Sequence, residues 1–168
     1  MRVAVSGTPG TGKTTASDLV ETDLDVINLN DVIKTEDLSL GIDEGRDTLV
    51  ADLDAVEEWL GERDDVLVDS HLAHHLPVDR VVVLRCRPED LEQRLRDRGE
   101  PDAKARENAE SEALDVILSE AVEEHGLESV YEIDTTDRTP DEVATEVERV
   151  LAGEREPSAG DVTFIDYL

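Results

Sequence analysis

The residues best suited to chemistry in this 168-residue chain form a glycine-rich segment near its start. Residues 7–14 read G-T-P-G-T-G-K-T and satisfy the pattern G-x-x-x-x-G-K-[S/T] at every position. Glycines in such a segment let successive backbone N–H groups turn toward a phosphate, and the following helix adds the positive end of its dipole. Lys13 can then reach the β- and γ-phosphates of a nucleoside triphosphate, and the Thr14 hydroxyl can bind Mg²⁺. We therefore predict a phosphate-binding loop that consists of Gly7, Gly10, Thr11, Gly12, Lys13, Thr14 and Thr15.

A second polar group follows the apolar run Val66–Val68. Ligands of open α/β sheets bind at the carboxyl ends of the strands, so Asp69 falls where a carboxylate can hold the hydration shell of Mg²⁺. The alternative is that Asp69 only caps a helix. His71 lies two residues further on, where it can face the same site and position a water or contact the phosphates; simple packing is its alternative.

His71, His74 and His75 also form an H-x-x-H-H cluster of the kind seen in some zinc sites. No cysteine or acidic ligand of suitable spacing accompanies the cluster, so we expect no zinc there. His74 and His75 are interpreted instead as residues that line the site or lie at the surface.

Alternating strands and helices must position these groups. Apolar runs predict five buried parallel strands, and right-handed crossovers then place helices on both faces, which gives a three-layer α/β fold. The predicted strands cover residues 2–6, 26–29, 66–68, 80–84 and 130–133. Helices are expected at about 13–20, at 53–60, from Pro88 to near Gly99 and at 139–151, and a short helix is expected after a cap at Asn30 or Asp31. A further long helix is expected to have its apolar face over residues 109–121.

The chain divides into a main domain, residues 1–152, and a tail, residues 153–168. Within the domain, the polar residues 36–47 carry Gly41 and Gly45, which indicates a mobile segment. The tail begins as a linker and becomes more apolar after residue 160. Docking onto the domain and fraying in solvent are both open.

Acidic residues dominate the composition, with 44 Asp and Glu against 16 Lys and Arg and a net charge of −28. In molar salt the Debye length is only about 3 Å, so self-repulsion is screened. We therefore hypothesise a cytosolic protein of an extreme halophile. The same charge disfavours direct binding to DNA or RNA and suits a basic protein partner.

No apolar stretch approaches the roughly 18 residues of a membrane span. The one cysteine, Cys86, is expected to be a buried, inert thiol.

The phosphate-binding loop alone leaves GTPases, larger ATPases and small kinases open. The guanine-reading N-K-x-D motif is absent and the chain is short for a multimeric ATPase, so a small kinase fits best. Together, G-T-P-G-T-G-K-T-T at 7–15, D-S-H at 69–71, R-G at 98–99 and E-N at 107–108 resemble the atypical adenylate kinases shared by archaea and eukaryotes. The resemblance covers about residues 1–150, and the eukaryotic members are nuclear and assist maturation of the small ribosomal subunit.

This resemblance implies a P-loop kinase with two mobile inserts, a monophosphate-binding segment at about 28–51 and a lid at about 97–107. It implies transfer of phosphate from ATP, with Mg²⁺, to AMP or another nucleoside monophosphate. ATPase activity and a small-subunit ribosomal protein as partner are implied as well. On the family pattern Asn28, Lys34 and Arg46 contact the monophosphate, and Arg98 grips the triphosphate from the lid. Lys34 stands where the family often has an arginine and offers a point charge instead of a bidentate fork, which weakens the expected affinity.

We expect Lys13, Asp69, His71 and Arg98 to carry the reaction. Lys13 and Arg98 would neutralise charge that develops on the transferred phosphoryl group, while Thr14 and Asp69 hold the metal. Two rival functions stay open. One is a ribosome-assembly ATPase with vestigial kinase activity, in which His71 orients the attacking water. The other is a P-loop kinase for a different small metabolite, such as a sugar acid.

Overall fold

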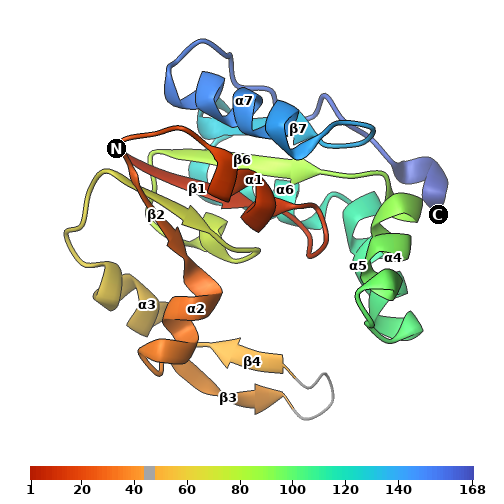
Figure 1. The fold of residues 1–168 in the computed structure, drawn as a ribbon, viewed down its shortest axis with the longest axis horizontal. Coiled ribbons are helices and arrows are strands. Elements are labelled where there is room, and N and C mark those ends of the chain that lie inside the picture. Colours follow the sequence, from red (N-terminus) through yellow and green to blue (C-terminus); the bar gives the residue numbers. More distant parts are fainter. Residues whose placement is uncertain (44–47) are drawn as a thin grey trace.

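The central feature of the computed structural model, which describes residues 1–43 and 48–168, is a five-stranded parallel sheet (Figure 1). Its strand order is β2-β5-β1-β6-β7. The bounds are β1 Arg2–Ser6, β2 Asp25–Asn28, β5 Val66–Asp69, β6 Arg80–Arg85 and β7 Val130–Asp134. The predicted α/β class and the five parallel strands are therefore confirmed.

Side chains on the two faces of this sheet pack into two separate cores. Val3 and Val5 of β1 face α1 (Lys13–Leu19) and α7 (Pro140–Leu151), whereas Ala4 faces the opposite side. That side is covered by α6 (Val116–His125), and its core also includes buried residues of α2 (Leu29–Thr35) and α3 (Leu53–Leu60). Because both faces are covered, the central strands β5, β1 and β6 are built on continuous apolar runs without polar alternation. The predicted three layers are confirmed.

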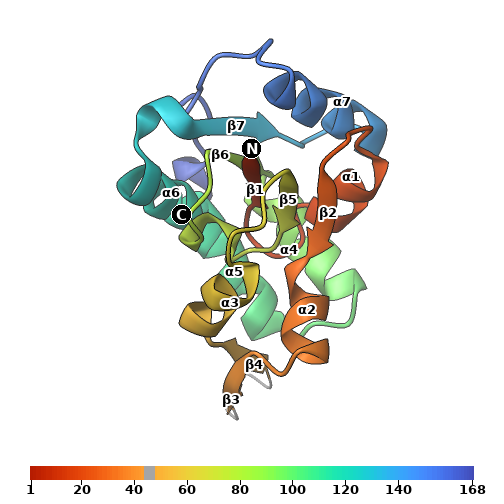
Figure 2. The same ribbon diagram turned by 90° about the vertical axis from the view of Figure 1, so that its left-hand side faces the viewer.

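Two parts of the chain extend away from the sheet (Figures 1 and 2). One contains α2, α3 and an antiparallel pair of strands, β3 (Ser39–Asp43) and β4 (Thr48–Ala51). The other is the helix pair α4 (Pro88–Asp97) and α5 (Asp102–Ala113). The first part includes most of the segment 28–51 and the second includes 97–107, the two ranges assigned to the inserts in the sequence; the assignment of these parts as inserts stays a prediction.

No strand was predicted in residues 36–47, because their polar composition and two glycines indicated a mobile segment. In the structure residues 39–43 form the strand β3, which pairs with 48–51. Leu40 and Ile42 alternate with smaller and polar residues, which is the two-residue period of a strand. Gly41 hid this period. Residues 44–47 lie outside the described part of the chain.

The long helix predicted through residues 109–126 is two helices, α5 and α6, so that prediction is also wrong. The break lies at Asp115, which has a positive φ of 56°. Its carboxylate accepts a hydrogen bond from the buried guanidinium of Arg85, which holds the residue in this conformation. Leu114 is consequently 55% exposed instead of facing the core. Within residues 1–43 and 48–168, no helix is long and apolar enough to cross a membrane.

Residues 153–168 pack onto the domain, which decides between the two open alternatives for the tail. The backbone N–H groups of Gly160 and Asp161 donate to Glu132 on β7, the second at 2.9 Å. Further on, the Phe164 ring lies 5.5 Å from the Arg85 guanidinium carbon, and the Tyr167 hydroxyl donates to Glu92 of α4 at 2.8 Å. The tail therefore contacts both the sheet and the α4–α5 pair.

Candidate functional site

The glycine-rich loop joins β1 to α1 and lies in close contact with β6 and α4. Gly7 and Gly10 have φ angles of 150° and 94°, and a Cβ on either would meet another residue. On Gly7 it would lie 2.7 Å from the Leu84 carbonyl oxygen, and on Gly10 2.9 Å from Leu91 Cδ1. Backbone conformation favours glycine at both positions, and at Gly7 the neighbouring backbone also leaves no space for a side chain. Gly12 begins α1 without a side-chain cap, so the first N–H groups of the helix are left for another acceptor.

Lys13 holds its amine under the loop, where Nζ donates to the Thr8 carbonyl oxygen at 3.2 Å. Burial lowers the pKa of Lys13 to about 8, against the raising effect of the Asp69 and Glu112 carboxylates. The amine therefore stays mainly protonated at neutral pH. A buried ammonium close to the loop can neutralise phosphate charge more strongly than one in solvent.

Thr14, Asn28 and Asp69 meet at the carboxyl ends of β2 and β5. Asn28 and Asp69 are direct partners in the sheet register, and Asn28 Nδ2 donates to Asp69 Oδ2 at 3.3 Å and to Thr14 Oγ1 at 3.4 Å. Asp69 is 3% exposed, and this burial raises its pKa, while a hydrogen bond with Thr14 and the charge of Lys13 oppose the rise. The Thr14 hydroxyl and the Asp69 carboxylate are oxygen donors of the kind that Mg²⁺ prefers, so these two residues fit the predicted metal, while Asn28 presents its NH₂ group to both.

Asn28 also begins α2, because its Oδ1 accepts the Asp31 N–H at 3.1 Å. The predicted cap at Asn30 or Asp31 is therefore wrong by two or three residues. The side-chain amide reaches the Thr14–Asp69 group while the carbonyl caps the helix. Asn28 thus connects Thr14 and Asp69 to the part of the chain that was assigned to the monophosphate.

His71 lies beyond β5 in a partly buried position near the phosphate-binding loop. Burial is the main cause that lowers its pKa to about 4, and the positive charge of Lys13 and the neighbouring His74, His75 and Lys104 contribute to the same shift. A neutral imidazole at physiological pH can accept a hydrogen bond from water or a hydroxyl. This suits the predicted role of positioning a nucleophile.

The lowered pKa of His71 gives a direct test. We expect its ring resonances to show no titration between about pH 7.5 and 5.5 in an NMR experiment, with His71→Gln used for the assignment. The unfolded chain binds this proton below about pH 6.5 and the folded chain only near 4, so the group costs stability as the pH falls through this window. A midpoint near 6.5 would contradict the buried, neutral His71.

The α4–α5 pair brings cations to the loop. Arg98 is the exposed C-terminal cap residue of α4, and its charge contributes to the lowered pKa of Lys13, which places it on the loop side. Arg94 lies one helical turn before Arg98 and donates from Nη1 to the Gly10 carbonyl oxygen at 3.3 Å. Arg94 was missed in the sequence, although its four-residue spacing from Arg98 could have indicated a shared face.

The remaining predicted site residues, Lys34, Thr15 and Arg46, are not among the side chains that meet at the glycine-rich loop in the described structure. Lys34 is exposed in the last turn of α2, and Thr15 is exposed in the first turn of α1. Arg46 lies outside the described residues. Monophosphate contacts by Asn28, Lys34 and Arg46 therefore stay predictions.

A buried ion-pair network lies directly behind the loop and was not anticipated. Arg85 at the end of β6 is fully buried and donates to Glu112 of α5 at 3.0 Å and to Glu132 of β7 at 2.7 Å. Glu112 also accepts from the Thr8 hydroxyl at 3.4 Å, so the network touches the loop. Glu112 lies three residues after the buried Ala109, a helical spacing that could have indicated a buried acid.

Cys86, which follows Arg85 in the chain, is buried as predicted, and burial raises the pKa of its thiol to about 11.

Three comparisons bear on this site. A family model described as "AAA domain" matches residues 3–115. A protein of Natronomonas pharaonis named "Putative adenylate kinase" is 66% identical over 168 residues, and one of the same name from Halobacterium salinarum is 59% identical over 169; each alignment covers 100% of both chains. A solved shikimate kinase from Bacteroides thetaiotaomicron has a TM-score of 0.57 at 17% identity, over 91% of this chain and 98% of that one, and supports the fold alone.

Proposed function

This chain belongs to the AAA-domain family and to the group of archaeal proteins named adenylate kinase, and from that premise we propose that it is a nucleoside monophosphate kinase. It transfers the γ-phosphoryl group of ATP to AMP or another nucleoside monophosphate. The observation that carries the proposal is the meeting of Lys13, Thr14 and Asp69 beside the glycine loop. Asn28 extends that meeting point to α2, where the acceptor segment begins.

In this reaction a phosphate oxygen of the monophosphate attacks the γ-phosphorus of ATP in line with the bond to the β–γ bridging oxygen. That bond breaks, and the electron pair leaves with the β-phosphate, which gives two diphosphates. The loop N–H groups orient the triphosphate, and Lys13 and Arg98 neutralise charge on the transferred group. Bound Mg²⁺ would supply further charge neutralisation, held by Thr14 and, through water, by Asp69. Little covalent chemistry is asked of the protein, so positioning is the main task.

The α4–α5 pair acts as the lid in this proposal. Arg98 at its corner would contact the triphosphate when the two extended parts of the chain approach each other. Exclusion of water at that moment would suppress hydrolysis.

An assembly ATPase is the second candidate, and one observation favours it. His71 is neutral and lies close enough to Lys13 for the lysine charge to lower its pKa. A neutral imidazole there could orient a water toward the γ-phosphate. The partner in this case would be a basic protein, such as a small-subunit ribosomal protein, because the chain carries a net charge of −28.

Nucleotide turnover separates the two candidates. Purified protein in molar KCl with Mg²⁺ is given ATP with and without AMP, and the products are quantified by chromatography. The kinase predicts two ADP for each AMP consumed and little free phosphate. Release of free phosphate at a rate that does not depend on AMP would overturn the kinase proposal and support the ATPase. The absence of any ATP turnover, with or without AMP, would refute both.

The acidic surface leads us to propose that this protein requires high salt for stability. We expect its thermal midpoint to fall steeply when KCl is reduced from molar concentration to about 50 mM, because the Debye length then rises well above 10 Å. Thermal unfolding at a series of KCl concentrations measures this, with NaCl as a second salt to separate screening from specific potassium binding. An unchanged midpoint at 50 mM would contradict the proposal.

A further inference from the structure

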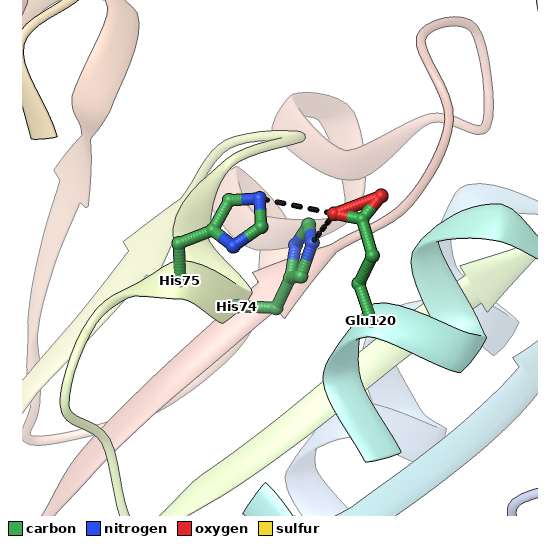
Figure 3. Close-up of side chains that lie close together, drawn as sticks. All are labelled: His74, His75 and Glu120. Atoms are coloured by element: carbon green, nitrogen blue, oxygen red, sulfur yellow. Dashed lines mark hydrogen bonds and ion pairs between the residues drawn. The ribbon is translucent and has the colours of Figure 1, made fainter. Parts of the chain in front are cut away.

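Three side chains on the sheet face that carries α6 converge on one point (Figure 3). His74 and His75 lie in the short helix η1 (Ala73–His75), which follows β5, and Glu120 lies on α6. The Nε2 atoms of His74 and His75 are 3.2 and 3.1 Å from the same carboxylate oxygen of Glu120. The three potential ligand atoms all lie within 4.8 Å of one another.

The second nitrogen of each ring is already held by another residue. His74 Nδ1 and Ser6 Oγ are hydrogen bonded at 2.7 Å, and His75 Nδ1 lies 2.5 Å from Glu124 Oε1. Both Nε2 atoms therefore point to the convergence with their ring orientation fixed from behind. A backing hydrogen bond of this kind, from a carboxylate or another polar group, accompanies almost every histidine that binds a metal in proteins.

We propose that His74 Nε2, His75 Nε2 and a Glu120 carboxylate oxygen bind a divalent transition-metal ion of the zinc type. Zinc lies about 2.0–2.2 Å from nitrogen and oxygen ligands, so neighbouring ligands of a tetrahedral ion are about 3.3 Å apart. The observed separations of 3.1 and 3.2 Å to Glu120 match this value. Two imidazoles and one carboxylate favour zinc over Mg²⁺, which prefers oxygen ligands, so this site and the Thr14–Asp69 group select different ions.

Burial gives the site one closed and one open side. The His74 side chain is 1% exposed and that of Glu120 is 37% exposed, so water can occupy the fourth position from the solvent side. The ion would cross-link η1 to α6 and so restrain the nearby residues Asp69–His71. Through the bond between His74 and Ser6 it would also stiffen the residue that precedes Gly7.

Zinc was not expected from the sequence because no acidic residue accompanies the histidines locally. The acid that completes the set lies 46 positions after His74 and is brought there by the packing of α6 on η1. A distant third ligand has no signature in the spacing of the first two.

Calorimetric titration with Zn²⁺ and visible spectra with Co²⁺ test the site without any nucleotide, so the result is independent of the proposed kinase activity. The protein is kept in molar KCl with excess Mg²⁺, which occupies or screens the many surface carboxylates. We expect one Zn²⁺ per chain, a tetrahedral Co²⁺ spectrum, and a thermal midpoint that rises with Zn²⁺ concentration.

Variants define the ligands. His75→Ala and Glu120→Gln should abolish the stoichiometric binding, whereas Glu124→Gln should weaken it about 10- to 100-fold, as expected for a backing partner. His125→Gln is the matched control, because His125 contacts the His74 carbonyl oxygen but offers no ligand to the cluster. Circular dichroism of each metal-free variant confirms folding, and Glu120→Gln keeps the size and hydrogen bonding of the native side chain.

Three results would overturn the proposal. One is wild-type binding that is weak and far from one ion per chain, as for scattered carboxylates. Another is equal binding by wild-type protein, His75→Ala and Glu120→Gln. A cobalt–thiolate charge-transfer band would instead assign the ion to Cys86.

Discussion

Replacing Lys13 by alanine is expected to lower the rate of phosphoryl transfer by about 10²- to 10³-fold, the usual cost of removing one charge-stabilising donor. The amine is buried at the Thr8 carbonyl, in surroundings that lower its pKa to about 8. Charge that develops on a phosphoryl group there has little water to stabilise it, so its loss is not easily compensated. The fold should survive, because the buried Asp69 carboxylate, which loses the nearby charge of Lys13, keeps its hydrogen bonds with Asn28 and Thr14.

Initial rates with saturating ATP and AMP measure this effect, and circular dichroism confirms the fold. Arg149→Ala is a suitable control, because Arg149 pairs with Glu146 on the surface of α7. That control should keep the wild-type rate, which shows that removal of one cation from an acidic protein is not in itself harmful. Full activity of Lys13→Ala would refute the assignment of the loop as the active site.

Replacing Arg85 by methionine is expected to lower the free energy of unfolding by about 3–5 kcal/mol, the range measured when one partner of a buried ion pair is removed. Glu112 and Glu132 are 3% and 1% exposed, and both form ion pairs with the Arg85 guanidinium. Without it, two carboxylates are left buried with no counterion. Asp115 loses the same partner, so the junction between α5 and α6 should also loosen.

Denaturant unfolding in molar KCl measures this loss. Arg87→Met is the matched control, two residues along the chain, where the side chain is 47% exposed and pairs with Asp90 and Asp137. Exposed pairs contribute only about 0–1 kcal/mol, so the control should be close to wild type. Equal losses in the two variants would mean that the buried network adds nothing specific.

The parts of the molecule that the sequence predicted are those whose signal is local. The phosphate-binding loop is a contiguous pattern, and each sheet strand is a short apolar run between helices. Asp69 could be placed because it directly follows such a run, and the carboxyl ends of parallel strands share one edge. Nothing beyond neighbouring residues was needed for any of these.

The parts that were missed depend on residues far apart in the sequence. Arg85 meets Glu112 and Glu132 only after α5 and β7 have packed against β6. Asp115, where the helical pattern breaks, is also hydrogen bonded to Arg85, and nothing in the spacing of residues 102–125 indicates that contact. Glu120 likewise reaches the two histidines through tertiary packing. Period and spacing describe one element at a time and cannot indicate such partners.

The docking of the tail on Glu132 also sets an order for folding during synthesis. Glu132 lies on β7 at the edge of the sheet, and its partners Gly160 and Asp161 are made 28 and 29 residues later. At about 5–20 residues per second, a nascent chain waits roughly one to six seconds between the carboxylate and the N–H groups that satisfy it. During that interval Arg85 can pair with Oε2 of Glu132, but Oε1 lacks its two N–H donors, so we expect β7 to be less firmly attached to the growing domain. The phosphate-binding loop, made first, can therefore form early, whereas the edge of the sheet at β7 gains its last hydrogen bonds only after Gly160 and Asp161 have been made.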